Sequence, residues 1–266
     1  MSALVNVGNK PVAILSRSSK SAGSLAELVG CPLFGEEYSL IPDSSDLILL
    51  SVPDDSLESV VEMIKKNWKY KPGTLVIHTS GIKESTLLEP LREYGAKTVS
   101  IHPIASFPAN EILPLDGIHF AIEGEEMDTA VGLVNSIGGI PMKIDAGKKA
   151  LYHAACTIAS GHLNILLETS LELLEKTGME EVRNVVAGLA ESSLKGWGND
   201  GIDSLTGSVA RGDVGSVRAH LKSLENSNEH LEIYRILALK AVNECESKGI
   251  LKRDKAEELK AALNGN

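Results

Sequence analysis

Two histidines occupy positions from which they could do acid–base chemistry at one site. His78 and His102 each come at the end of an apolar stretch with the composition of a β-strand. Because ligands of parallel sheets bind at the carboxyl ends of the strands, we expect both imidazoles to line one site wall. A histidine at a strand end more often makes a structural hydrogen bond, and that alternative stays open.

A stripe of polar side chains follows on the first long helix expected in the C-terminal half. Lys149, His153, Ser160 and Asn164 are separated by four, seven and four residues, which places them along one helix face. A substrate with carboxylate or carbonyl groups would satisfy such polar groups, as would side chains of other helices. His153, or a Lys149 with a lowered pKa, could donate a proton for carbonyl or imine reduction, whereas Tyr152 is expected to point elsewhere.

Alternating strands and helices must position these residues. Apolar runs predict strands at about 12–16, 32–34, 46–52, 74–78, 97–102, 118–122 and 141–144. The unbroken run at 46–52 is typical of a parallel strand covered on both faces. Helices are expected between them at about 1–10, 21–29, 55–67, 84–93 and 126–137.

From about residue 148 the strand pattern ends. Helices are expected at 148–177, 181–195, 214–225, 228–248 and 253–263, the first of them buried between subunits or domains. We therefore predict an α/β, doubly wound domain over residues 1–147 and an all-α domain over residues 148–266.

Composition narrows the class of partner. The formal net charge of -10 means that nucleic acid or an anionic membrane surface would be repelled, so a small-molecule substrate is expected. Cys31, Cys156 and Cys245 are far apart and lack C-x-x-C spacing, which indicates neither a disulfide framework nor a metal site. With no export signal and no apolar run near the ~20 residues of a membrane span, we expect a cytoplasmic protein.

Two short segments could contact a nucleotide cofactor. Ser16, Arg17 and Ser18 end the strand that normally meets the adenosine ribose, where an arginine with small hydroxyl neighbours favours the 2'-phosphate of NADP over NAD. Val52 and Pro53 begin a turn that could lie against the ribose and nicotinamide. The alternatives are a solvated turn for the first segment and helix capping by the aspartates that follow the second.

A loop at 205–213 offers substrate contacts in the helical half. Thr206 and Arg211 lie in it, and Arg211 could bind a substrate carboxylate with two hydrogen bonds. Alternatively, Asp213 caps the next helix and Arg211 forms a structural ion pair.

Five motifs give the chain a family resemblance: SVPDD at 51–55, HTSG at 78–81, HPIASF at 102–107, KALYHAA at 149–155 and LTGSVARGD at 205–213. With them the sequence resembles Rossmann-like proteins that carry a helical C-terminal domain of unknown function. These proteins belong to a wider group with pyrroline-5-carboxylate reductase, ketopantoate reductase and the 6-phosphogluconate dehydrogenase type. The resemblance implies a dinucleotide-binding domain, a helical dimer-forming domain and an NADP-dependent oxidoreductase that acts as a homodimer.

The start of the sequence departs from that family. The family pattern opens with a strand and a glycine-rich loop, whereas residues 1–10 here are typical of the helix that follows them. We expect a start site placed too far downstream, or a natural truncation. The missing strand would lie between the strands at 12–16 and 46–52, which then either pair directly or keep unpaired backbone groups. A second departure is Ser160-Gly161, where the family often has Ser-Asn.

These inferences combine into one functional prediction: an oxidoreductase that moves a hydride between NADP and a small carbonyl or imine substrate. The expected catalytic residues are Lys149, His153, His102 and Ser160. The expected cofactor-binding residues are Ser16, Arg17, Ser18, Val52, Pro53, His78 and Ser80. Substrate is expected to contact Ser106, Asn164, Thr206 and Arg211. The alternative is a non-catalytic binding or regulatory dimer that lost the phosphate loop.

Overall fold

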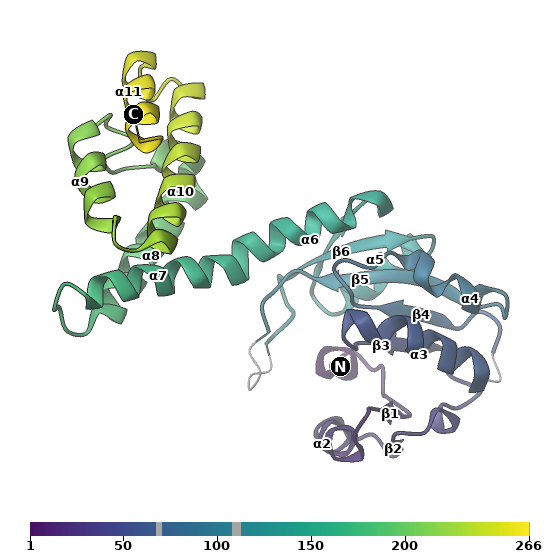
Figure 1. The fold of residues 1–266 in the computed structure, drawn as a ribbon. Helices are drawn as coiled ribbons and strands as arrows, with labels where there is room; N and C mark the ends of the chain where they lie inside the picture. Colours follow the sequence, from purple (N-terminus) through teal and green to yellow (C-terminus); the bar gives the residue numbers. More distant parts are fainter. Residues whose placement is uncertain (68–70, 108–112, 266) are drawn as a thin grey trace. The chain divides into compact units, whose positions relative to one another are not determined.

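The computed structural model of the chain describes residues 1–67, 71–107 and 113–265 and places the strands in two separate sheets (Figure 1). In the smaller sheet β1 (Ile14–Leu15) pairs in parallel with β2 (Phe34–Gly35). The larger sheet has the strand order β3-β4-β5-β6-β7. Its strands are β3 (Leu47–Leu50), β4 (Leu75–His78), β5 (Lys97–Pro103), β6 (His119–Gly124) and β7 (Ile140–Lys143).

The division into two sheets separates β1 and β3, the two strands that were expected to lie on either side of the missing first strand. β1 belongs to the small sheet, and β3 is an edge strand of the large one. Direct pairing of these two strands, one of the two expected arrangements, is therefore not what the structure has. Within the described ranges, β1 and β3 each keep one edge without a strand partner.

The large sheet is mixed rather than wholly parallel. β5 and β6 run antiparallel, with Ile101 opposite Ile122, while the other neighbouring pairs are parallel. A parallel crossover normally needs a long connection, usually a helix. The described part of the β5–β6 connection contains no helix, which fits the antiparallel return.

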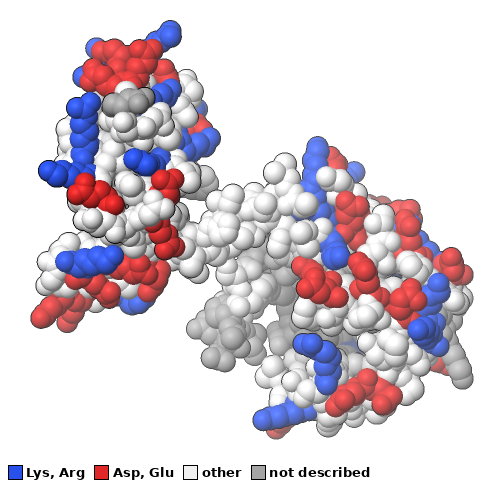
Figure 2. Space-filling view, viewed as in Figure 1, with Lys and Arg blue, Asp and Glu red and all other residues white. Residues whose placement is uncertain are grey.

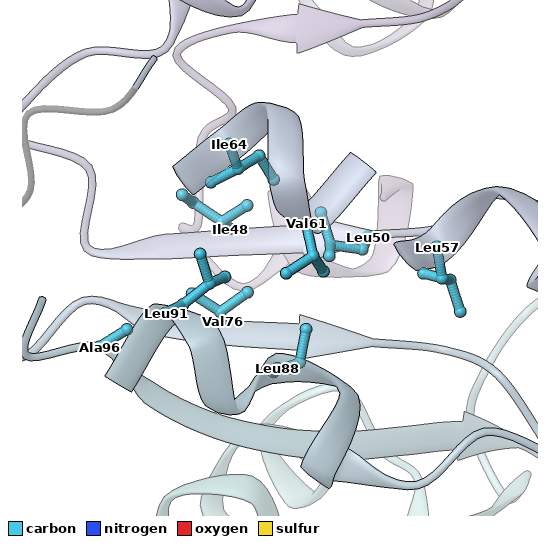
Figure 3. Close-up of a cluster of buried hydrophobic side chains, with 9 residues drawn as sticks. All are labelled: Ile48, Leu50, Leu57, Val61, Ile64, Val76, Leu88, Leu91 and Ala96. Carbon is cyan, nitrogen blue, oxygen red and sulfur yellow. The ribbon is translucent and has the colours of Figure 1, made fainter. Parts of the chain in front are cut away.

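One face of the large sheet is covered by α3 (Asp54–Asn67), η2 (Ser85–Leu88) and α4 (Glu89–Arg92). Figure 3 shows the side chains that fill this layer, which come from β3, β4, the three helices and the residue before β5. They are Ile48, Leu50, Leu57, Val61, Ile64, Val76, Leu88, Leu91 and Ala96.

The opposite face is covered less completely. α5 (Met127–Ser136) packs there on Val99, Ile101 and other residues of β4, β5 and β6. Leu47 and Leu49 of β3 are only partly buried on this face. The prediction that this apolar strand is covered on both faces therefore holds fully for the α3 face and only partly for this one, where β3 lies at the sheet edge.

Local sequence signals set the helix ends near the sheet. Ser18 caps α2 (Ser19–Val29) by accepting a hydrogen bond from the Ser21 N–H, and Gly30 ends the helix at φ 66°, in the left-handed region that favours glycine. α3 begins with two aspartates, which the positive end of the helix dipole favours. α1 (Ser2–Asn6) is shorter than the helix expected over residues 1–10.

Residues 149–175 are helical throughout but not uniformly α-helical. α6 (Lys149–Thr157) passes into a π-helical stretch, η4 (Ile158–His162), and α7 (Leu163–Glu175) follows. Two compact units, Met1–Ser160 and Gly161–Asn266, meet inside this π-helical stretch, so α6 belongs to the first unit. Because a π-helical turn holds more residues than an α-turn, the face predicted from a 3.6-residue period does not continue past Thr157.

The second unit is all helix in its described residues. After α7 come α8 (Val182–Asp200), η5 (Gly201–Ser204), α9 (Val214–Leu224), α10 (Asn228–Ser247) and α11 (Arg253–Leu263). Its main core lies among α9, α10 and α11 around Val217, Val242 and Leu259, while Leu171, Val182 and Val186 join α7 to α8. The predicted order of an α/β domain followed by an all-α domain is confirmed.

Charged residues are interspersed on the face of the first unit that Figure 2 shows, without a continuous field of one sign. No helix in the described ranges is long and apolar enough to cross a membrane. Cys31, Cys156 and Cys245 are free thiols. Among residues 1–67, 71–107 and 113–265, no three His, Cys, Asp or Glu side chains are grouped closely enough to hold a metal ion.

Candidate active site

His78 organises the loop that leaves the carboxyl end of β4. Its ring is fully buried, Nδ1 accepts a hydrogen bond from the Ser80 N–H at 3.2 Å, and Nε2 lies 3.2 Å from the Glu84 carbonyl oxygen. Because Nδ1 accepts, the proton is on Nε2, which donates to Glu84. Burial, and after it the charge of Lys149, lowers the pKa of His78 to about 4. Both ring nitrogens are thus engaged with the loop, and any effect of His78 on a cofactor would be indirect.

Lys149, the first residue of α6, is buried against the ends of β4 and β5. Its side chain is 2 % exposed, and Nζ donates to the Ser80 carbonyl oxygen at 2.9 Å and to Ser100 Oγ. Ser100 lies directly opposite His78 in the β4–β5 register. Burial lowers the pKa of Lys149 to about 8, and the partly compensating negative charges come first from Glu123 and then from Glu84. The lowered lysine pKa that proton donation would need is therefore present.

Tyr152 and His153 bring α6 against His102. The Tyr152 hydroxyl oxygen lies 2.6 Å from His102 Nδ1, and the two rings meet edge-to-face with centroids 5.7 Å apart. The His153 ring is also edge-to-face with His102, at 5.9 Å. Tyr152 was expected to point elsewhere. That expectation is wrong, because residues three apart on a helix are neighbours and the long tyrosine side chain reaches the strand beside Lys149.

Gly81 lets the two imidazoles approach the loop. A Cβ atom at Gly81 would lie 2.5 Å from His153 Cδ2 and 2.9 Å from His102 Nε2, too close for either ring to stay in place. Gly81 is buried and its φ angle is not in the left-handed region, so space rather than backbone conformation requires glycine here.

Glu123 of β6 holds the other end of the loop. Its carboxylate accepts from the Ser85 N–H and from the Ser85 hydroxyl, both at 2.7 Å, and it is nearly fully buried. A buried carboxylate with two charge-assisted hydrogen bonds is a rigid anchor. The loop between β4 and η2 is therefore fixed at both ends, by His78 and by Glu123.

A cavity of about 510 Å³ in the first unit adjoins this cluster. Ser51, Thr79 and His102, which follow or end β3, β4 and β5, line it together with mainly apolar side chains from α1, α2, α5 and the sheet. Its volume is typical of small-molecule sites. Of the four clustered side chains His78, His102, Lys149 and His153, only His102 contributes to its wall, so His102 connects the cavity with α6.

A larger groove of about 920 Å³ lies between α3 and residues 82–93. Glutamate and lysine side chains line much of it, and it contains none of the predicted site residues. Because none of the clustered side chains lines this groove, it is a weaker candidate for the chemistry.

Comparison with known families agrees with this architecture. The model of a Rossmann-like domain matches residues 12–103, and that of a domain of unknown function, DUF2520, matches residues 118–241. The chain is a Rossmann-like protein with a DUF2520 domain. The DUF2520 match begins inside the α/β unit, at the residue before β6, and extends into α10. No curated protein sequence matches the chain.

Solved structures show the same fold. Protein TM1727 from Thermotoga maritima is 25% identical, with 88% of this chain and 90% of that chain covered and a TM-score of 0.71. Protein BF3122 from Bacteroides fragilis is 19% identical, with 90% and 91% covered and a TM-score of 0.73. A reductive aminase from Aspergillus terreus is 14% identical, with 97% and 92% covered and a TM-score of 0.62.

In the Rossmann-like domain, the predicted cofactor segments lie where the sequence suggested. Ser16, Arg17 and Ser18 follow β1, with Arg17 exposed and Ser18 capping α2. Val52 and Pro53 lie between β3 and α3. Their contacts with a cofactor stay predictions.

Several predicted residues lie outside the cluster. Ser106 is exposed after β5, and Ser160 Oγ donates to the Cys156 carbonyl oxygen of its own helix at 2.7 Å. Asn164, Thr206 and Arg211 are exposed residues of the second unit. Asp213 does cap α9, through the Ser216 N–H at 3.0 Å. Leu151 of α6 and Ile158 of η4 are exposed apolar side chains. The homodimer stays a prediction.

The imidazoles of His78 and His102 predict acid sensitivity. Burial lowers the pKa of both His78 and His102 from 6.5 to about 4, so as pH falls below 6.5 the unfolded chain takes up protons that the folded chain does not. The free energy of unfolding should therefore decrease between pH 6.5 and 4. Urea midpoints followed by circular dichroism at pH 7 and pH 5 measure this.

Replacing His102 by glutamine should reduce that pH dependence. His119→Gln is the matched control, because His119 is exposed on β6. A urea midpoint equal at both pH values, or a larger effect of His119→Gln, would contradict the prediction.

Proposed function

We propose that this protein is an NADP-dependent oxidoreductase that transfers a hydride between the nicotinamide and a small carbonyl or imine substrate. The observation that carries the proposal is the cavity at the carboxyl ends of β3, β4 and β5, with His102 in its wall and Lys149, Tyr152 and His153 behind it. The Aspergillus terreus reductive aminase has a similar fold and was also solved in complex with NADPH and ethyl levulinate, which supports the proposal.

The described residues fit the two ends of the cofactor. Arg17, exposed after β1, would bind the 2'-phosphate, with Ser16 and Ser18 beside it. Val52, Pro53 and Ser80 would lie near the ribose and nicotinamide at the sheet edge. When bound, NADPH supplies the hydride.

The protein's own contribution is to place hydrogen-bond donors beside the acceptor. The Lys149 ammonium has three hydrogens, and two of them have protein acceptors among the described residues, Ser80 and Ser100. Its pKa of about 8 keeps it charged at neutral pH while making it a better proton donor than an ordinary lysine. Apolar side chains around the cavity exclude water, which strengthens these electrostatic contacts.

A substitution at Arg17 tests whether the protein binds NADPH in preference to NADH. Arg17→Glu should weaken NADPH binding at least about tenfold, because one charge-assisted contact is replaced by repulsion, and should change NADH binding little. Quenching of NADPH and NADH fluorescence measures both dissociation constants.

Lys66→Glu makes the same charge change on the exposed surface of α3 and should leave NADPH binding unaltered. Absence of NADPH binding by the unmodified protein would refute the proposed function. Equal weakening by both variants would refute the role of Arg17.

A further inference from the structure

The two nitrogens of the His102 ring have different surroundings. Nδ1 faces α6, 2.6 Å from the Tyr152 hydroxyl oxygen. Nε2 lies on the opposite side of the ring, close to the Gly81 backbone, where an added Cβ would come within 2.9 Å of it. His102 is also the member of the cluster that lines the cavity.

The protonation of the pair follows from these surroundings. Burial raises the pKa of Tyr152 well above its ordinary value, so the phenol keeps its proton and can donate it. Burial, with His153 and Lys149 nearby, lowers the pKa of His102 to about 4, so the imidazole is neutral and has one N–H. A neutral imidazole that accepts at Nδ1 must carry its proton on Nε2.

We propose that Tyr152 is a positioning residue that donates to His102 Nδ1 and thereby fixes the tautomer in which Nε2–H is the hydrogen-bond donor. The catalytic use of this tautomer rests on the proposed function. A neutral imidazole N–H can polarise a substrate oxygen without bringing a second full charge to the site.

The same arrangement selects a substrate class. The Nε2–H of His102 needs a lone pair to donate to, which a carbonyl oxygen has and an iminium nitrogen lacks. The Lys149 ammonium, buried beside Ser80 and Ser100, would also repel a cationic iminium. The site therefore suits a neutral ketone or aldehyde rather than an iminium ion.

Nitrogen NMR of the full chain, labelled with ¹⁵N-histidine, tests the tautomer without substrate or cofactor. At pH 7 the His102 ring should show a pyridine-like Nδ1 and a pyrrole-like Nε2, assigned by their loss in His102→Gln. In Tyr152→Phe the two nitrogens should move toward values averaged over both tautomers. A pyrrole-like Nδ1 in the unmodified protein, or an unchanged tautomer in Tyr152→Phe, overturns the proposal.

The second unit contains a matched control. The Tyr234 hydroxyl lies 2.9 Å from His220 Nδ1, and their rings meet edge-to-face at 5.6 Å, much like the Tyr152–His102 pair. Tyr234→Phe should alter the His220 signals and leave His102 unchanged. If it shifts His102 as much as Tyr152→Phe does, the effect is not local and the assigned role of Tyr152 fails.

The same spectra test the substrate class. Cyclohexanone, a neutral ketone, should shift the His102 Nε2 signal, whereas the tetramethylammonium cation should not. A shift by the cation alone, or by neither probe, overturns the carbonyl assignment. Because the tautomer measurement involves no NADPH, its failure is distinguishable from a failure of cofactor binding.

Discussion

Replacing Lys149 by methionine is expected to lower turnover by a factor of about 10² to 10⁴, the range typical of losing a positioned proton donor. Methionine has a similar length and fills the same buried space at the start of α6. It cannot donate and carries no charge, so the buried donor that we propose acts on the substrate from behind His102 is lost. NADPH oxidation with a ketone substrate at pH 7 measures the effect.

The same substitution should change stability much less than turnover. Methionine removes a buried charge whose lowered pKa, about 8, shows that burial disfavours it. Against this gain, the Ser80 carbonyl and the Ser100 hydroxyl lose their donor, which costs about 1–3 kcal/mol. The two effects oppose each other, so the urea midpoint at pH 7 should move only slightly.

The pH dependence of stability distinguishes a buried, titrating Lys149 ammonium from a Lys149 side chain that only fills space. The folded-state pKa of Lys149 is lowered from 10.5 to about 8, so between these values the unfolded chain binds more protons than the folded chain. Its contribution to the free energy of unfolding therefore rises as pH increases from 8 to 10.5, and Lys149→Met should lack that rise.

Lys148→Met is the control for Lys149. Lys148 is exposed and pairs with Asp145 at 3.0 Å on the surface, so its loss should affect neither turnover nor the alkaline rise in stability. Unchanged turnover in Lys149→Met would show that Lys149 only anchors α6 to the sheet.

The part of this site that the sequence could predict is the part set by residues close together in the chain. Strand ends and helix spacing are local patterns, and they are enough to select His102, Lys149 and His153 as site residues. Ser100 could also have been predicted, because it lies two residues before His102 and so shares its face of β5. Tyr152 was missed because only the residue four positions after Lys149 was placed on its helix face, although the residue three positions after it is also a neighbour.

Other features have no local signal. The fit of Gly81 against two imidazoles depends on α6 meeting the β4 loop, some seventy residues away in sequence. Glu123 and Ser85 meet only because β6 runs antiparallel to β5. The position of β3 at a sheet edge likewise depends on which strands pair, and its apolar sequence resembles that of a central strand.

Replacing Gly81 by alanine is expected to reduce turnover by about 10²-fold or more, because misplacing a reacting group by an ångström has an effect of that size. The new Cβ would lie 2.5 Å from His153 Cδ2 and 2.9 Å from His102 Nε2, so both rings must move. Overpacking a buried position usually costs about 1–3 kcal/mol of stability, which the urea midpoint would report. The ¹⁵N signals of both rings should shift.

Gly132→Ala makes the same chemical change in α5 of the same unit, where an added Cβ meets nothing within 4 Å. It should leave turnover unaltered and stabilise the protein by about 0.5–1 kcal/mol, the ordinary gain of alanine over glycine inside a helix. If Gly81→Ala shifts both histidine signals yet turns over like the unmodified protein, the chemistry does not depend on where these rings lie. The cavity would then have to work through Ser51 and Thr79 instead, the two other polar residues that line it after β3 and β4.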